Sequence, residues 1–162
     1  MFVHLILETY KLLFERNFYQ FGTILQKNPQ IINSLRTKKQ AATLLMKAAN
    51  QGQHNIVEFL LSRPQDLSVT TRTFHNALHF ISLRVGAAFK YLDETQITDD
   101  LLNQHDHEKK LTPLHFAAKS NNQTAIKWLL DQGADPLIKD FNGKIPDDLC
   151  EESTKKLFLN YK

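Results

Sequence analysis

Seven histidines and several runs of acidic residues are the side chains in this 162-residue sequence that could take part in chemistry. The segment His105-Asp106-His107-Glu108 combines imidazole and carboxylate groups, and both are good ligands for a metal ion such as Zn²⁺. In an extended segment, however, alternate side chains point to opposite sides, and the sequence offers no second cluster of ligands. We therefore predict no metal site and no bound cofactor.

Nucleophiles and acid–base pairs are equally isolated. Cys150 is the single cysteine and has no neighbour that favours the thiolate form, so we expect an inert, partly buried thiol. The pairs Asp147-Asp148 and Glu151-Glu152 fit the negative charge that stabilises a helix start. The sequence has no glycine-rich phosphate loop and no Ser/His/Asp arrangement. We predict that the chain has no catalytic residues and is not an enzyme.

Composition favours one folded domain in a reducing compartment. A chain of 162 residues is about one domain long, and 42% hydrophobic residues are enough for a core. One cysteine excludes a disulfide framework, so we expect a cytoplasmic location. The apolar start MFVHLILETYKLLF has no preceding basic residues and is interrupted by Glu8 and Lys11. This pattern predicts an amphipathic helix rather than a signal peptide or a membrane span.

The net charge of +3 is unevenly divided along the chain. Residues 1–90 contain 11 Lys/Arg and 4 Asp/Glu, whereas residues 91–162 contain 9 and 13. The basic N-terminal half fits either an acidic partner or an unevenly charged, solvated surface. Its charges are too dispersed to indicate nucleic-acid binding.

The stretch LTPLHFAAKSNN, residues 111–122, shows how helices are encoded locally. Thr112 can cap the free amides of a first helical turn, and Pro113 fits the first helical position because it has no amide to lose. Asn121 tolerates the positive φ of a tight turn. A second helical pattern follows directly, with Ile126 and Leu129 on one face. The unit is predicted to be a helix, a turn and an antiparallel second helix.

This unit is repeated along the chain. TPLHFAAKSNNQTAIKWLL, residues 112–130, aligns without a gap on TLLMKAANQGQHNIVEFLL, residues 43–61. A third copy, NALHFISLRVGAAFKYL at residues 76–92, has a second helix that is short and out of step. A fourth and weaker copy occupies the start of the chain, with its turn at Arg16-Asn17. The leucines Leu45, Leu78 and Leu114 are 33 and 36 residues apart.

The period and the T-P-L-H-x-A signature identify the sequence as resembling an ankyrin-repeat protein. The resemblance implies an all-α ankyrin-repeat solenoid of about four helix-turn-helix repeats plus a C-terminal cap, with short β-turn fingers. We place one domain at residues 1–162, with repeats at about 1–34, 35–70, 71–105 and 106–139 and the cap at 140–162. His79 and His115 match the histidine that bonds to neighbouring backbone in this family, which implies a structural role. We also expect Leu45, Leu114, Ile126 and Leu129 to be buried between repeats.

In this family the first helices and the fingers form a concave groove that binds protein partners. When the groove positions of the family are mapped onto this sequence, the resemblance implies groove residues on three first helices and on the finger tips. These partner-binding residues are Lys47, Asn50, Gln51, Arg72, Phe74, Phe80, Arg84, Phe116, Lys119 and Phe141. The first finger would add Arg36, Lys38 and Lys39. The alternative for Phe80 and Phe116 is packing within the stack, and for Phe74 and Phe141 packing within the finger hairpins.

The resemblance favours a non-catalytic protein–protein interaction module whose groove binds an acidic and apolar partner segment. The sequence also resembles ankyrin effectors that intracellular bacteria export into host cells. Its C-terminal EES with LFLNYK behind it is similar to the tail of type IV secretion substrates, which would imply a virulence role in the host cytoplasm. The alternative is an enzyme or a regulatory inhibitor subunit that uses the irregular third repeat, residues 86–103, as its site.

Overall fold

The computed structural model describes residues 2–32 and 42–161. Short helices and the loops that join them account for this part of the chain. The α-helices are α1 (Phe2–Phe14), α2 (Phe18–Lys27), α3 (Leu44–Asn50), α4 (His54–Leu61), α5 (Ala77–Arg84), α6 (Asp99–Asn103), α7 (Pro113–Lys119), α8 (Gln123–Asp131) and α9 (Glu152–Lys155). Five 3₁₀-helices lie between them: η1 (Pro29–Ile31), η2 (Gly86–Tyr91), η3 (Glu94–Gln96), η4 (Pro146–Leu149) and η5 (Lys156–Phe158).

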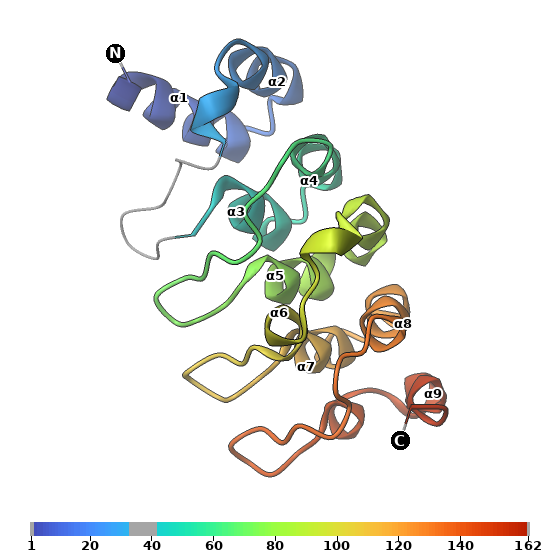
Figure 1. Cartoon of the computed structure of the whole chain (residues 1–162). Coiled ribbons are helices and arrows are strands. Elements are labelled where there is room, and N and C mark those ends of the chain that lie inside the picture. The colour runs from blue at the N-terminus through green and yellow to red at the C-terminus, as the bar shows by residue number, and fades with distance from the viewer. Residues whose placement is uncertain (1, 33–41, 162) are drawn as a thin grey trace.

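The helices stack as antiparallel pairs in one continuous row (Figure 1). The first helices α1, α3, α5 and α7 follow one another along the row, and the second helices α2, α4 and α8 form a parallel layer. Loops project to one side of the first helices as fingers. The predicted all-α solenoid with a C-terminal cap is confirmed.

Side-chain caps fix where the first helices begin. The hydroxyl oxygen of Thr112 accepts a hydrogen bond from the amide of His115, and Thr43 caps α3 in the same way through the amide of Met46. Asn76 takes this role for α5. Such caps satisfy amides that a helix start would otherwise leave unpaired. The predicted helix start at Thr112-Pro113 is confirmed.

The turns inside the α1–α2, α3–α4 and α7–α8 pairs each use a residue in the left-handed region. Asn121 has φ 51° in the turn between α7 and α8, as its type predicts. Arg16 and Gly52 take the corresponding place before α2 and α4, with φ of 56° and 66°. These three pairs therefore share one turn geometry, whereas the turn between α5 and η2 has no residue in the left-handed region.

One hydrophobic core runs through the stack. Leu114, Ile126 and Leu129 are fully buried, and Leu45 is 2% exposed, so the expected burial of these four side chains is confirmed. Alanines such as Ala117 and Ala118 line the first helices and allow close approach. Each pair therefore shares its core with its neighbours, because a single pair cannot bury its own apolar face.

The third pair is irregular. Its second helix is the 3₁₀-helix η2, and it begins at Gly86, where a Cβ atom would lie 2.4 Å from Nδ2 of Asn122. Asn122 caps α8 and also donates to the carbonyl oxygen of Ser82 at 3.0 Å. The additional short helix α6 follows η3 in this unit. The sequence predicts the short second helix but not α6.

The described fingers are joined by main-chain hydrogen bonds. Within the fingers the amides of Thr71, Asp106 and Asp140 donate to carbonyl oxygens four or five residues further on. Between fingers, the amide of His107 donates to Thr73 at 3.2 Å and that of Phe141 to Lys109 at 3.0 Å. The predicted finger residues Arg36, Lys38 and Lys39 lie outside the described residues.

Across residues 2–32 and 42–161, no helix is long and apolar enough to cross a membrane.

Candidate partner-binding groove

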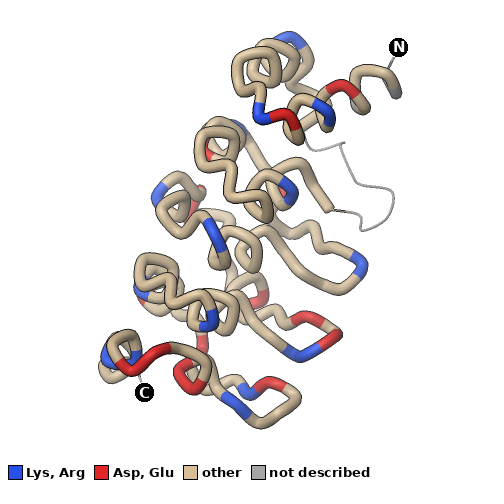
Figure 2. The backbone as a smooth tube through the Cα atoms, turned by 180° about the vertical axis from the view of Figure 1, so that it is seen from behind, with Lys and Arg blue, Asp and Glu red and all other residues tan. Residues whose placement is uncertain are grey.

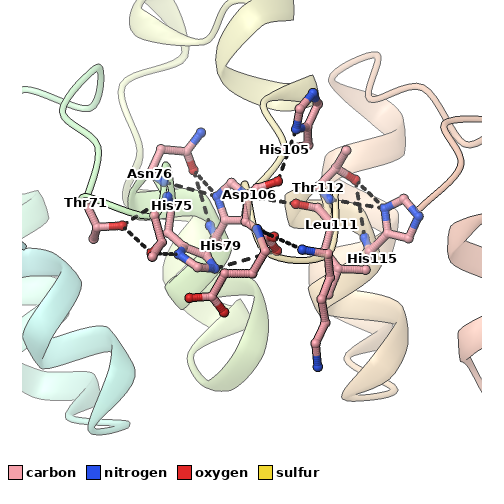
Figure 3. A network of polar contacts seen from close by, with 12 residues as sticks. Thr71, His75, Asn76, His79, His105, Asp106, Leu111, Thr112 and His115 are labelled. Atoms are coloured by element: carbon pink, nitrogen blue, oxygen red, sulfur yellow. Dashed lines mark hydrogen bonds and ion pairs between the residues drawn. The ribbon is translucent and has the colours of Figure 1, made fainter. Parts of the chain in front are cut away.

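The buried histidines His79 and His115, both labelled in Figure 3, tie the first helices α5 and α7 to the fingers that follow them. Nε2 of His79 lies 3.2 Å from the carbonyl oxygen of Leu111, and Nε2 of His115 lies 3.3 Å from that of Lys144. Nδ1 of His115 accepts the amide of Thr112 at 3.2 Å, which leaves the proton on Nε2 to be donated. Both imidazoles therefore make the backbone bonds expected for a structural role.

The environment of these histidines keeps them neutral. Burial and, to a smaller extent, the charge of neighbouring His75 lower the pKa of His79 to about 3. Burial also lowers the pKa of His115. A neutral imidazole can accept at one nitrogen and donate at the other, which is what both bonding patterns require.

His75 lies between two fingers and contacts Thr73 of its own finger and Asp106 of the next. Its Nδ1 atom lies 2.8 Å from the hydroxyl oxygen of Thr73, and its Nε2 atom lies 3.7 Å from the carboxylate of Asp106. Burial lowers the pKa of His75, opposed by the charges of Asp106 and Glu108. The carboxylate of Asp106 also accepts the amides of Glu108 and Lys109, so it fixes the turn of its own finger.

Aromatic rings surround His75. Its ring centroid lies 5.7 Å from that of Phe80 and 5.4 Å from that of Phe116. Phe116 also meets His79 edge to face, with centroids 5.3 Å apart. Phe80 and Phe116 are both half-buried, so each packs against the stack and keeps part of its surface in solvent.

A hollow of about 430 Å³ opens beside this cluster. It gathers Asn50 from the end of α3, Arg72 from a finger and Phe80 from α5, three residues that the sequence assigns to the groove. Thr71, Thr73, His75 and Glu108 complete its lining. The arrangement offers an aromatic floor with polar groups and one exposed guanidinium at the rim.

The other predicted groove residues lie in several places. The ammonium group of Lys47 lies over the ring of Phe14, 5.4 Å from its centroid. Gln51 is half-buried and accepts a hydrogen bond from Gln53, while Arg84 and Lys119 are exposed at the ends of α5 and α7. No described ion pair involves Arg84 or Lys119, so both cations face solvent.

The two predicted finger aromatics are not part of the hollow beside Phe80. Phe74 stacks on His107 with the ring centroids 3.7 Å apart, and both residues line a separate hollow next to α6. Phe141 is 65% exposed on the last finger, where its amide bonds to Lys109. Phe74 therefore packs against the next finger and not beside Phe80.

Sequence reasoning missed Phe14 and four residues that line the hollow. Phe14 is 59% exposed at the end of α1, at the position that Asn50 occupies in α3. Thr71, Thr73, His75 and Glu108 line the hollow itself. The turn residues Arg16 and Gly52 could have set the register of the first unit and identified Phe14, because both precede a second helix by two residues.

Charge is graded along the stack. Figure 2 shows Asp and Glu mostly in the C-terminal part, in line with 13 acidic residues among residues 91–162.

The described residues contain no group of three or more His, Cys, Asp or Glu side chains placed to hold a metal ion. Cys150 is half-buried, and burial raises the pKa of its thiol, which favours the unreactive protonated form.

Comparison with known proteins agrees with this architecture. The family model for ankyrin repeats matches residues 23–140 in three copies. The ARF GTPase-activating protein GIT1 of Homo sapiens is 28% identical over 119 residues, which are 74% of this chain but 14% of that protein. The fowlpox virus ankyrin repeat protein FPV230 is 44% identical over 48 residues, 30% of this chain and 26% of that protein. The chain thus spans only a small part of the length of these relatives.

Proposed function

Because the chain belongs to the ankyrin-repeat family, we propose that it is a protein–protein interaction module that binds a partner through its concave groove. Ankyrin repeats are generally interaction modules and are typically non-catalytic. The observation that carries the proposal is the hollow shared by Asn50, Arg72 and Phe80, three residues from three separate elements of the stack.

The chemistry of the groove supports an acidic and apolar partner segment. Phe14, Phe80 and Phe116 each keep exposed surface, and aromatic side chains in partly buried positions are frequent anchors of binding energy. Lys47, Arg72, Arg84 and Lys119 add positive charge around them. Basic rim residues speed the encounter with an acidic partner, while the aromatic anchors slow its release.

Affinity capture with matched variants tests this proposal. The wild-type chain and a Phe80→Ala/Phe116→Ala variant would be immobilised at equal density and exposed to the same cell lysate. A Glu58→Ala/Lys127→Ala variant, changed only on exposed positions of α4 and α8, serves as the control. We expect one set of proteins to be retained by the wild type and the control and lost from the groove variant. If the groove variant retained these proteins and the control variant lost them, the binding surface would lie on the opposite face.

The role as an exported effector and the absence of catalysis stay predictions. The C-terminal segment packs onto the stack, with Phe158 buried and Tyr161 donating a hydrogen bond to Asp131. A translocation reporter fused to the chain, compared with a fusion that lacks residues 151–162, tests export. The irregular third unit, which the enzyme alternative would use, contributes a hollow that we interpret as a binding surface.

A further inference from the structure

A second hollow, of about 770 Å³, lies beside α6 and outside the groove. No residue that lines it also lines the hollow beside Phe80. Its lining combines the additional helix of the third unit with two fingers: Ser68, Phe74, Thr98, Asp99, Asp100, Leu101, Asn103, Gln104, His105 and His107. This volume is in the range of sites that hold several atoms of a ligand rather than a single ion.

One wall of this hollow is an aromatic platform. Phe74 and His107 come from successive fingers, and their rings stack with centroids 3.7 Å apart and planes 14° from parallel. The amide of His107 also bonds to the carbonyl oxygen of Thr73, so the two fingers are held in register beneath the rings. Phe74 remains 40% exposed despite the stack. A large apolar ring is therefore presented to solvent in a fixed orientation.

The hollow also carries carboxylates without a cation. Asp99 and Asp100 are both exposed, and neither belongs to an ion pair among the described residues. No lysine or arginine is found among the described residues of the lining. This contrasts with the groove hollow, where Arg72 stands at the rim. The charge of the second hollow is therefore complementary to a cationic ligand.

We propose that the hollow between α6 and the Phe74–His107 stack binds an arginine-containing basic segment of a partner protein. A guanidinium group stacks on aromatic faces and bonds to carboxylates with two parallel N–H groups. One arginine side chain could therefore contact both the aromatic rings and the carboxylates of Asp99 and Asp100. An ammonium group is a point charge and stacks less well on a ring. The chain would then present an acidic site and a basic groove on separate surfaces, and bind two partners of opposite charge.

Binding of a labelled peptide tests this inference directly. The probe is the fluorescein-labelled peptide Gly-Arg-Gly-Arg-Gly, titrated with the full chain at low salt and followed by fluorescence anisotropy. We expect saturable binding by the wild type and about tenfold weaker binding by Asp99→Asn/Asp100→Asn. This variant leaves the N-cap Thr98 of α6 unchanged, and circular dichroism checks that the chain stays folded. The matched control Glu94→Gln/Glu151→Gln removes two charges outside the lining and should bind within about twofold of wild type.

Two further arms separate stacking from simple attraction. Phe74→Asn keeps a residue that tolerates positive φ and removes the ring, so it should weaken the arginine peptide by severalfold. The peptide Gly-Lys-Gly-Lys-Gly should bind more weakly than the arginine peptide. The inference is overturned if the wild type shows no saturable binding up to about 1 mM peptide. It is equally overturned if the Glu94/Glu151 control loses as much affinity as the Asp99/Asp100 variant, or if Phe74→Asn and the lysine peptide change nothing.

Discussion

His79 and Leu111 are 32 residues apart in the chain, yet the Nε2 atom of the first donates to the carbonyl oxygen of the second at 3.2 Å. His115 repeats the relationship with Lys144 in the next unit. The first helices α5 and α7 are thereby each joined to the base of the following finger. The bond belongs to the stacking of units, since a single pair in isolation would lack its acceptor.

Loss of this bond should destabilise the whole stack. His79→Ala removes a fully buried imidazole and leaves the Leu111 carbonyl without its donor, so we expect a loss of roughly 2 to 4 kcal/mol of unfolding free energy. Urea denaturation measures it. His54→Ala, at an exposed position of α4, should stay within about 0.5 kcal/mol of wild type. Equal effects for the two variants would contradict the role of His79.

Acid should weaken the fold before most carboxylates titrate. Burial lowers the pKa of His75, His79 and His115 below 6.5, that of His79 to about 3. The unfolded chain binds protons on these imidazoles near pH 6.5, whereas the folded chain binds them only at a lower pH. Stability is thus complete above pH 6.5 and falls as the pH drops toward 3, by up to about 1.4 kcal/mol per unit of pKa shift.

Denaturation at pH 7.5, 6.0 and 5.0 measures this slope. The wild type should lose stability at each step, and His79→Gln, which has no imidazole to protonate, should show a shallower slope. A wild-type stability that stays constant or increases from pH 7.5 to 5.0 would contradict the burial of neutral histidines.

The register of the helices can be tested at Leu114. This side chain is fully buried between units, so Leu114→Ala should cost roughly 2 to 5 kcal/mol. Thermal or chemical denaturation gives the value. A loss below about 1 kcal/mol would mean that Leu114 does not face the core.

Gly86 should be required by the close approach of Asn122. A Cβ atom there would lie 2.4 to 2.7 Å from three side-chain atoms of Asn122, which itself bonds to Ser82 and caps α8. We expect Gly86→Ala to cost about 1 to 3 kcal/mol. Gly22→Ala is the control, since its Cβ would make only an ordinary 3.5 Å contact with Phe59. This second variant should be neutral or slightly stabilising in denaturation experiments, because alanine favours a helix.

Where the T-P-L-H signature is present, the sequence predicts local structure down to single contacts. Thr112, Pro113, His115 and Asn121 each occupy the position and conformation that their types require. These features depend on a few neighbouring residues, so they can be interpreted without knowledge of the rest of the fold. The boundaries assigned to the repeats and the partner-binding set stay predictions.

The irregular parts could not be predicted because they depend on contacts between distant segments. The stack of Phe74 on His107 joins two fingers that are 33 residues apart and carry no shared motif. The first unit lacks the signature altogether, so Phe14 can be aligned with Asn50 only through the turn residues Arg16 and Gly52. Helix α6 is five residues long and has too little periodicity to be distinguished from a loop.

Once a partner has been identified, variants of the groove residues should distinguish effects on the association rate from effects on the dissociation rate. Arg72→Glu/Arg84→Glu should mainly lower the association rate, and the effect should shrink at high salt because both side chains are exposed. Phe116→Ala should mainly raise the dissociation rate, by about tenfold or more if the ring is an anchor worth ~2 kcal/mol. Surface plasmon resonance resolves the two rates. Unchanged rates in both variants would place the partner elsewhere.

Site-specific photo-crosslinking tests the concave-groove proposal most directly. A photoreactive phenylalanine analogue would replace Phe80, inside the hollow with Asn50 and Arg72, or Lys127, at an exposed position of α8. After irradiation with the captured partner, we expect a covalent complex from position 80 and none from position 127. A complex formed from position 127 but not from position 80 would contradict the groove as the binding surface.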